Sequence, residues 1–264
     1  MSMQGRAVLV TGGSSGIGAA AARLFAEAGA RVMIAARGAE RGEALARELR
    51  GTGADVRFVR ADMASAPDIE RMIAETVSAF GRLDAAVNNA ATTDGAFRLT
   101  ADFTPEEFDL AIGANLRGVW LCLKHEVRQM LAQDPAGGAI VNTSSVNGLG
   151  GAPGGALYSA AKAGVLALTK SAAQEYATQG IRVNALVAGG FLTPMLEDVF
   201  RRLGGDAEEG RAAVRERYEG MVAMRRLGRP EEAAAAAVWL CSDQASYVTG
   251  HSMIVDGGMT AATR

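Results

Sequence analysis

The sequence has little of the chemistry that marks disulfide-bonded or metal-binding proteins. Its two cysteines and two histidines, Cys122, Cys241, His125 and His251, are isolated along the chain, without metal-ligand spacing. We therefore expect no metal site. Isolated cysteines in apolar segments are typical of buried thiols in a reducing compartment, and they predict a cytoplasmic protein.

An excess of charge of one sign is also missing. The chain carries 27 basic and 29 acidic side chains, a net charge of −2. Nucleic acids and anionic membranes attract clustered basic residues, so we expect neither partner. No apolar run approaches the ~20 residues of a membrane-spanning helix, and the first residues do not predict a signal peptide.

Glycine, in contrast, is abundant, with 33 residues, and strand-like runs alternate with helix-like segments. We predict strands at 6–11, 31–37, 55–63, 83–90, 138–145, 181–188 and 251–258. Helices are expected at 18–30, 39–53, 67–80, 104 to about 134, 158–178 and 229–242. This alternation is typical of a parallel sheet covered by helices on both faces.

The chain shows no internal linker, repeat or low-complexity tract, so residues 1–264 are predicted to form a single domain. Segment 193–228 breaks the alternation with charged, glycine-interrupted stretches. We interpret it as a helical lid over a substrate site. A solvated surface helix is the alternative.

The first strand is followed by "TGGSSGIG" (11–18). Glycines here allow a tight turn and a close backbone approach, and the next helix begins with unpaired N–H groups. The turn therefore predicts a site for the pyrophosphate of a dinucleotide. Its residues are Gly12, Ser14, Ser15, Gly16, Ile17 and Gly18.

Tyr158 and Lys162 are the only large polar residues in "ALYSAAKAG" (156–164). At this spacing they share one helix face, with their Cβ atoms about 5–6 Å apart. A free phenol has a pKa of about 10, and a nearby ammonium lowers it. We expect Tyr158 to act as a general acid/base. A core tyrosine beside a snorkelling lysine is the alternative from spacing alone.

Ser145 ends the fifth predicted strand, thirteen residues before Tyr158 and across a Gly/Pro-rich loop. That loop can fold the strand end back against the start of the helix. A hydroxyl there can bond a substrate carbonyl and the alkoxide that develops from it. Ser144 is the rival serine.

The pattern T-G-x-x-x-G-x-G at Thr11–Gly18, with Tyr158 and Lys162, resembles the short-chain dehydrogenase/reductase family. The resemblance covers residues 5 to about 260. It implies a Rossmann fold, a doubly wound sheet of seven parallel strands. The implied reaction is hydride transfer between a nicotinamide cofactor and a small-molecule carbonyl or secondary alcohol. The family also implies a homotetramer that uses the helices of Trp120 and Tyr158.

The resemblance also implies roles for individual residues. Ser145 would polarise the carbonyl, Tyr158 would transfer the proton, Lys162 would bind the ribose, and Asn115 would hold a water in the proton relay. The S-V-x-G sequence from Ser145 onward favours it over Ser144, as in β-ketoacyl carrier protein reductases. Further implied cofactor residues are Asp62, Met63, Asn89, Ala90, Gly189, Phe191 and Thr193.

The end of the second strand bears on the choice of cofactor. An acidic residue there would bond the 2′-hydroxyl of NAD, but the position holds Ala36, and Arg37 follows. A guanidinium binds a phosphate in a forked geometry, which favours NADP(H). NAD(H) stays possible, since Ser15 stands where NADP-preferring relatives often carry Lys or Arg. Arg37 as a solvated charge is the alternative.

Two other functions are the alternatives, and the sequence argues against each. An epimerase or dehydratase of the extended branch would carry T-G-x-x-G-x-x-G, and a non-catalytic NADP(H)-sensing regulator typically loses the tyrosine or the lysine. The substrate is left open by the sequence. The expected lining is neutral: Thr92, Thr93, Asn147, Leu149, Pro153, Phe191 and Met195.

Overall fold

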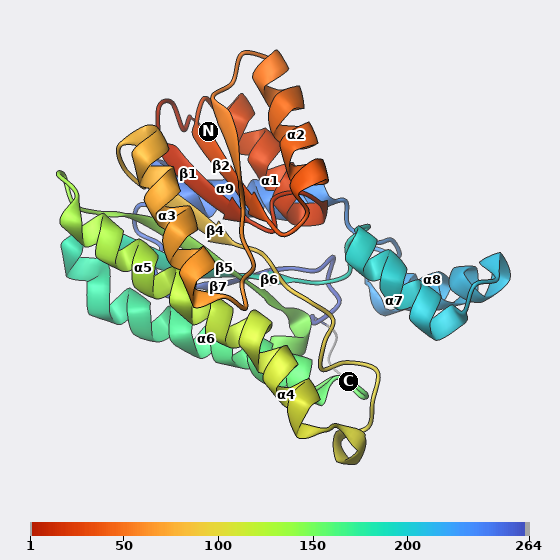
Figure 1. The fold of residues 1–264 in the computed structure, drawn as a ribbon. Helices are drawn as coiled ribbons and strands as arrows, with labels where there is room; N and C mark the ends of the chain where they lie inside the picture. Colours follow the sequence, from red (N-terminus) through yellow and green to blue (C-terminus); the bar gives the residue numbers. More distant parts are fainter. Residues whose placement is uncertain (1, 262–264) are drawn as a thin grey trace.

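A computed structural model describes residues 2–261, which build one seven-stranded parallel sheet (Figure 1). The strands are β1 (Ala7–Thr11), β2 (Arg31–Ala36), β3 (Val56–Arg60), β4 (Ala85–Asn88), β5 (Gly138–Ser145), β6 (Ile181–Ala188) and β7 (Ser252–Val255). Their order in the sheet is β3-β2-β1-β4-β5-β6-β7. The predicted doubly wound parallel sheet is confirmed, with its order reversing between β1 and β4.

Helices cover both faces of the sheet. One layer consists of α1 (Gly16–Glu27), α2 (Ala39–Gly51) and α9 (Pro230–Cys241). The other consists of α3 (Ala66–Phe80), α5 (Gly118–Ala132) and α6 (Ala156–Tyr176). Three further helices, α4 (Pro105–Ile112), α7 (Pro194–Gly204) and α8 (Glu208–Met221), lie outside these layers, and α7 and α8 project from the body (Figure 1).

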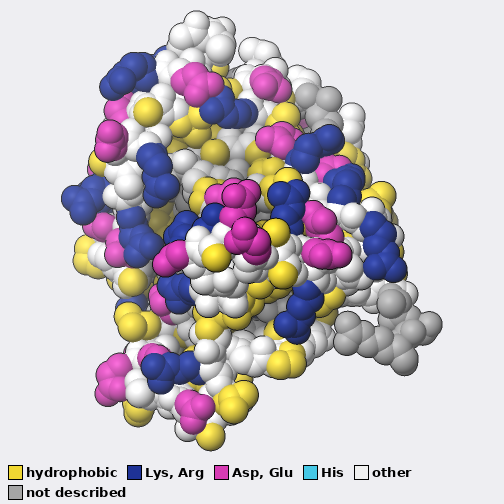
Figure 2. All heavy atoms as spheres, turned by 90° about the vertical axis from the view of Figure 1, so that its right-hand side faces the viewer, with side chains coloured by type: hydrophobic (Ala, Val, Ile, Leu, Met, Phe, Trp, Pro, Cys, Tyr) yellow, Lys and Arg dark blue, Asp and Glu magenta, His cyan; other side chains and the backbone are white. Residues whose placement is uncertain are grey.

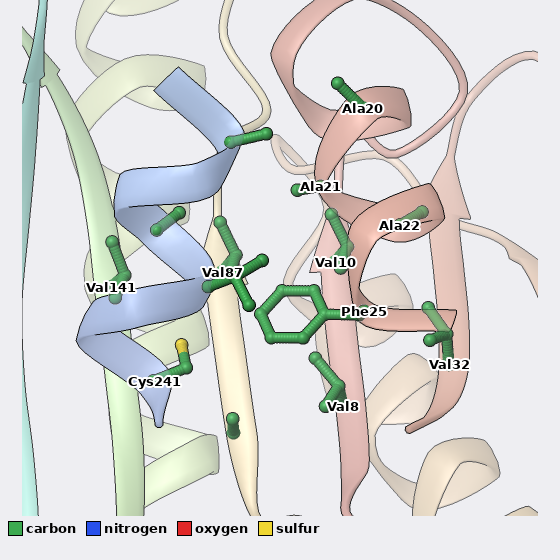
Figure 3. Close-up of a cluster of buried hydrophobic side chains, with 14 of the residues drawn as sticks. Val8, Val10, Ala20, Ala21, Ala22, Phe25, Val32, Val87, Val141 and Cys241 are labelled. Atoms are coloured by element: carbon green, nitrogen blue, oxygen red, sulfur yellow. The ribbon is translucent and has the colours of Figure 1, made fainter. Parts of the chain in front are cut away.

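Side chains of β1 alternate between the two layers, as the pleat requires. Val8 and Val10 point to the α1/α9 side, while Leu9 points to the α3/α5 side. Figure 3 shows the fully buried Phe25 ring reaching from α1 across β1 toward Val87. Truncating such a ring to alanine costs about 3–5 kcal/mol of folding free energy. This core fixes the strand ends that carry the site.

The helix expected from 104 to about 134 is interrupted. A π-helical turn at Gly113–Arg117 separates α4 from α5 and contains the buried Asn115. Just after it, Gly118 lies against the backbone carbonyl of Met63, where a Cβ has no room. Single π-helical turns inside α-helices are frequent at functional sites. A π-helical turn contains one residue more than an α-helical turn, and the periodicity of the sequence does not predict it here.

Segment 193–228 forms α7 and α8, which pack on each other. They cross where Gly204 meets the backbone of Gly210, and the Phe200 and Tyr218 rings meet edge to face with centroids 5.4 Å apart. The two ends of the segment are tied together, since Leu192 N donates to Gly228 O at 2.8 Å. The segment therefore leaves and rejoins the body at one place.

On the face that carries α7 and α8, basic and acidic side chains are interspersed (Figure 2). Within residues 2–261, no helix combines the length and apolarity needed to cross a bilayer. In the same residues, no three His, Cys, Asp or Glu side chains gather in a way that could hold a metal ion.

Candidate active site

A cavity of about 1510 Å³ opens at the carboxyl ends of the strands. This is where ligands bind in doubly wound sheets, beside the reversal of strand order. Most residues singled out from the sequence line it: Gly12, Ser14, Ser15, Gly16, Ile17, Arg37, Asp62, Met63, Asn89, Ala90, Ser145, Tyr158, Lys162, Gly189, Phe191 and Thr193. Gly18 and Asn115 do not line it. Gly18 instead lies against the carbonyl of Gly12, at the start of α1.

The glycine turn and the turn after β4 are held together. The Thr11 hydroxyl accepts hydrogen bonds from Asn89 N at 3.1 Å and from Ala90 N at 3.2 Å. Gly12 has a φ of 64°, and a Cβ there would lie 2.8 Å from the Cα of Ala90. A larger residue at position 12 would force the two turns apart. Glycine is needed here for close approach as well as for backbone conformation.

The N-terminus of α1 fits an anionic ligand. Ser15 occupies the N-cap position without a side-chain capping bond, and the first turn contains no acidic residue. By contrast, Ser65, Thr104 and Thr193 cap α3, α4 and α7 with their hydroxyls. The first N–H groups of α1 thus have no side-chain acceptor at the cap. Together with the glycine cradle, they match the charge of a pyrophosphate.

The far end of the cavity is basic. Arg37 follows β2 and lines the cavity together with Arg41, while Ala36 leaves no carboxylate at the strand end. Asp62 lines the same end, and its Oδ1 accepts a hydrogen bond from Ala64 N at 3.0 Å. Arg41 was missed from the sequence. It lies in the first turn of α2, where side chains point back toward the helix start.

Tyr158 and Lys162 lie on α6 beside the end of β5. The buried Lys162 Nζ donates to Thr143 O at 3.0 Å and lies 5.7 Å from the centroid of the Tyr158 ring. Burial lowers the pKa of Lys162 to about 8. Burial also raises the pKa of Tyr158 to about 12, against an opposing hydrogen bond from Ser145.

These directions correct one sequence-based expectation. The ammonium of Lys162 was expected to lower the pKa of Tyr158, but the pKa of the phenol is raised. Lys162 is buried and Tyr158 is half-buried, and desolvation disfavours the charged form of each one. The phenol is therefore held in its protonated form.

The two serines at the end of β5 are engaged differently. Ser144 is buried, and its hydroxyl donates to the backbone carbonyl of Lys162 at 2.8 Å. Ser145 is only half-buried, and its oxygen accepts from Asn147 N at 3.2 Å, which leaves its hydroxyl proton for another partner. Ser144 thus ties β5 to α6, and Ser145 is the better placed of the two toward Tyr158.

Asn115 makes its side-chain hydrogen bonds to the loop after β4. Its Oδ1 accepts from Thr92 N at 3.0 Å, and its Nδ2 donates to Thr92 Oγ1 at 3.4 Å. The amide is therefore occupied by Thr92. The relay to Lys162 implied by the family resemblance stays a prediction.

A buried polar network supports the ends of β4 and β5. Asn88 Nδ2 donates to Asn142 Oδ1 at 3.0 Å and to Glu126 Oε2 at 2.9 Å, and Asn142 in turn donates to Thr169 at 3.0 Å. Glu126, on α5, is fully buried, and burial raises its pKa to about 8. Sequence reasoning missed Glu126, although a lone carboxylate on an apolar helix face was a possible signal.

The substrate side of the cavity is more varied than expected. Thr92, Thr93, Asn147, Pro153, Phe191 and Met195 line it, whereas Leu149 does not. The lining also includes Asp94, Arg98, Asp109 and Arg217, so the expectation of a neutral wall is wrong. Asp94 and Arg98 come from a loop and Asp109 from α4, which the periodicity did not place near the site, whereas Arg217 belongs to the segment interpreted as a lid.

Known proteins resemble this chain over nearly its whole length. A family model described as enoyl-(acyl carrier protein) reductase matches residues 12–260. An A-factor type gamma-butyrolactone 1′-reductase (1S-forming) of Streptomyces virginiae is 44% identical over 97% of this chain and 95% of its own. A 2,5-dichloro-2,5-cyclohexadiene-1,4-diol dehydrogenase of Sphingobium indicum is 39% identical over 98% of both chains.

The fold has a close counterpart among solved structures. The crystal structure of levodione reductase superposes with a TM-score of 0.92 at 37% identity, over 98% of this chain and 99% of that one. Fold, glycine turn and relatives agree with the resemblance seen in the sequence. The chain belongs to the short-chain dehydrogenase/reductase family and is an NAD(P)-dependent oxidoreductase.

Proposed function

We propose that the protein reduces the carbonyl group of a small molecule with NADPH, with Tyr158 as the proton donor. The observation that carries this proposal is that Ser145, Tyr158 and Lys162 line the same cavity as the glycine turn. A bound nicotinamide cofactor would supply the hydride. The residues of the chain would bind the substrate oxygen and deliver the matching proton.

The proton chemistry rests on three side chains. The Ser145 hydroxyl would donate a hydrogen bond to the substrate oxygen and stabilise negative charge developing there. Tyr158, protonated at neutral pH, would pass its phenolic proton to that oxygen. The Lys162 ammonium, 5.7 Å from the ring centroid, would favour the phenolate left behind. The raised pKa of Tyr158 keeps the phenol protonated at neutral pH, so its proton is available to the substrate oxygen.

Preference for NADP(H) over NAD(H) is part of the proposal. It is supported by two guanidinium groups, Arg37 and Arg41, and by Ala36 in place of a carboxylate. A 2′-phosphate has the charge and the forked acceptor geometry that arginine side chains bind well. The test is kcat/KM with each cofactor for wild type and for Arg37→Ala. Better efficiency with NADH in the wild type would overturn this preference.

The reductase proposal itself is tested by NADPH oxidation over a panel of ketones. Tyr158→Phe should lose turnover by about 10²–10⁴-fold, because it removes the proton donor. Its affinity for NADPH, measured by fluorescence titration, should stay close to that of wild type. Tyr176→Phe, near the end of the same helix, is the control. A Tyr158→Phe variant with near-normal rates would refute the acid/base role.

Assembly and location stay predictions. We propose a homotetramer in which α5 and α6 form contacts between copies, because the Trp120 side chain on α5 is exposed. Light scattering after size exclusion would test it, and a monomer would contradict it. A cytoplasmic location is supported only by the two free, buried thiols, Cys122 and Cys241. We also propose that segment 193–228 acts as a lid over the substrate.

A further inference from the structure

The outer end of the cavity has an apolar character that proton transfer does not explain. Large apolar side chains that are exposed to solvent line this end: Leu99, Leu110, Met195, Leu203 and Met221. Leu99 and Leu110 are 69% and 61% exposed. Exposed apolar side chains gathered around one concave site mark a place for an apolar ligand.

These side chains come from two opposite walls. On one wall, Met195, Leu196, Val199 and Leu203 follow helical spacing along one face of α7, and Met221 ends α8. On the other wall are Leu99, before α4, and Leu110 within it. A groove with apolar side chains on both walls can remove a hydrocarbon from water on two sides.

Phe97 fixes the geometry between the two walls. It has a φ of 72°, in the left-handed region that bulky residues rarely adopt. The neighbouring Arg98 N donates to Gly154 O at 3.1 Å, which holds this loop against the start of α6. The Arg202 guanidinium of α7 lies 5.4 Å from the Phe97 ring centroid. The strained residue thus joins the loop to α7 across the cavity.

The charges at this end do not form an anion site. Arg98 pairs with Glu107 at 3.2 Å, and Arg202 stacks on Phe97. The other charged residues lining this end are Asp94, Asp109 and Arg217. Together with Glu107, three carboxylates balance three guanidinium groups, so this end has no net positive charge to attract a phosphate or carboxylate tail.

We propose that this groove, between α7/α8 and the Leu99–Leu110 wall, binds a hydrocarbon part of the substrate, an alkyl chain that extends from the reactive carbonyl. The inference rests on the proposed function for the position of the carbonyl beside Tyr158. It adds the chemical class of the substrate: ketones with an apolar chain of several carbons. Affinity should therefore grow with chain length.

The experiment measures Kd for 2-butanone, 2-hexanone, 2-octanone and 2-decanone by calorimetry, with protein saturated with NADP⁺, so that no turnover is needed. The Kd should fall by up to about fourfold for each methylene that becomes buried. Met221→Glu places a charge in the groove and should abolish most of this dependence. Met224→Glu is the matched control, since Met224 is exposed but does not line the cavity.

The outcomes separate the two proposals. A Kd that does not change with chain length, or a dependence that Met221→Glu and Met224→Glu leave equally intact, would overturn the apolar groove. Circular dichroism on both variants shows that the fold is retained. If chain length governs binding as expected but none of the ketones supports oxidation of NADPH, the apolar groove is retained and the proposed reductase function is refuted.

Discussion

Glu126 offers a direct test of how burial controls charge in this molecule. Its side chain is fully buried, and its Oε2 accepts a hydrogen bond from Asn88 Nδ2 at 2.9 Å. Burial raises its pKa from 4.5 to about 8. The folded protein therefore holds a proton between these pH values that the unfolded chain releases, and its stability should fall as pH rises through this range.

The size of the effect follows from the two pKa values. Each pKa unit corresponds to about 1.4 kcal/mol, so the free energy of unfolding should fall by about 4 kcal/mol between pH 5 and 8 from this group. Glu126→Gln keeps the shape and the acceptor for Asn88 but removes the titration. Neighbouring thiols do not interfere, because burial raises the pKa of Cys122 well above 9 and that of Cys241 to about 12.

The measurement is urea unfolding followed by the fluorescence of Trp120 and Trp239, at a fixed protein concentration and at pH 5, 6, 7 and 8. As pH rises from 5 to 8, the free energy of unfolding of wild type should fall by about 4 kcal/mol relative to that of Glu126→Gln. Glu216→Gln, at an exposed position of α8, is the control and should give parallel curves. Parallel curves for Glu126→Gln would refute a protonated Glu126.

Three further predictions concern the candidate site. Ser145→Ala should lower kcat/KM by about 10²–10³-fold. Ser144→Ala should mainly lower the free energy of unfolding in urea, by about 1–3 kcal/mol, because its hydrogen bond to Lys162 O is lost. A larger loss of kcat/KM in Ser144→Ala than in Ser145→Ala would contradict these roles. Gly12→Ala should weaken NADPH binding in fluorescence titration by more than about tenfold, because its Cβ meets Ala90 at 2.8 Å. Gly53→Ala is the control, since Gly53 also has a positive φ, 91°, but an added Cβ would meet no atom within 4 Å; this variant should bind NADPH with the affinity of wild type. Since burial lowers the pKa of Lys162 to about 8, kcat/KM for reduction should decline above pH 8 as the ammonium is lost, and a rising pH profile would count against its role.

Local signals were sufficient to predict much of the fold. The strand periodicity and the turn residues predicted seven strands, because parallel strands buried on both faces are short β-branched runs. The residues of the glycine turn could be named, because only small residues permit that backbone approach. Tyr158, Lys162 and Ser145 could be placed together because the strand end and the helix start are adjacent along the chain.

What could not be predicted depends on contacts between distant segments. The π-helical turn at Asn115 has no periodic signature, and it lies next to the close contact of Gly118 with the backbone of Met63. The pKa of Tyr158 depends on how deeply the site is buried, which sequence spacing does not report. The apolar groove combines a loop with α7 and α8, and the order of residues along the chain does not predict that Leu99 and Leu203 line one cavity.

The joined base of segment 193–228 has a consequence for how such a protein can change. Because Leu192 and Gly228 meet at 2.8 Å, the chain between them closes on itself before it returns to the sheet. Residues can then be inserted, deleted or replaced within this excursion without moving the strand ends that carry Ser145 and the turn at Gly12. With segment 193–228 as the proposed lid, selectivity and reactivity would be encoded in separable stretches of the polypeptide, so that one could diverge while the other is kept.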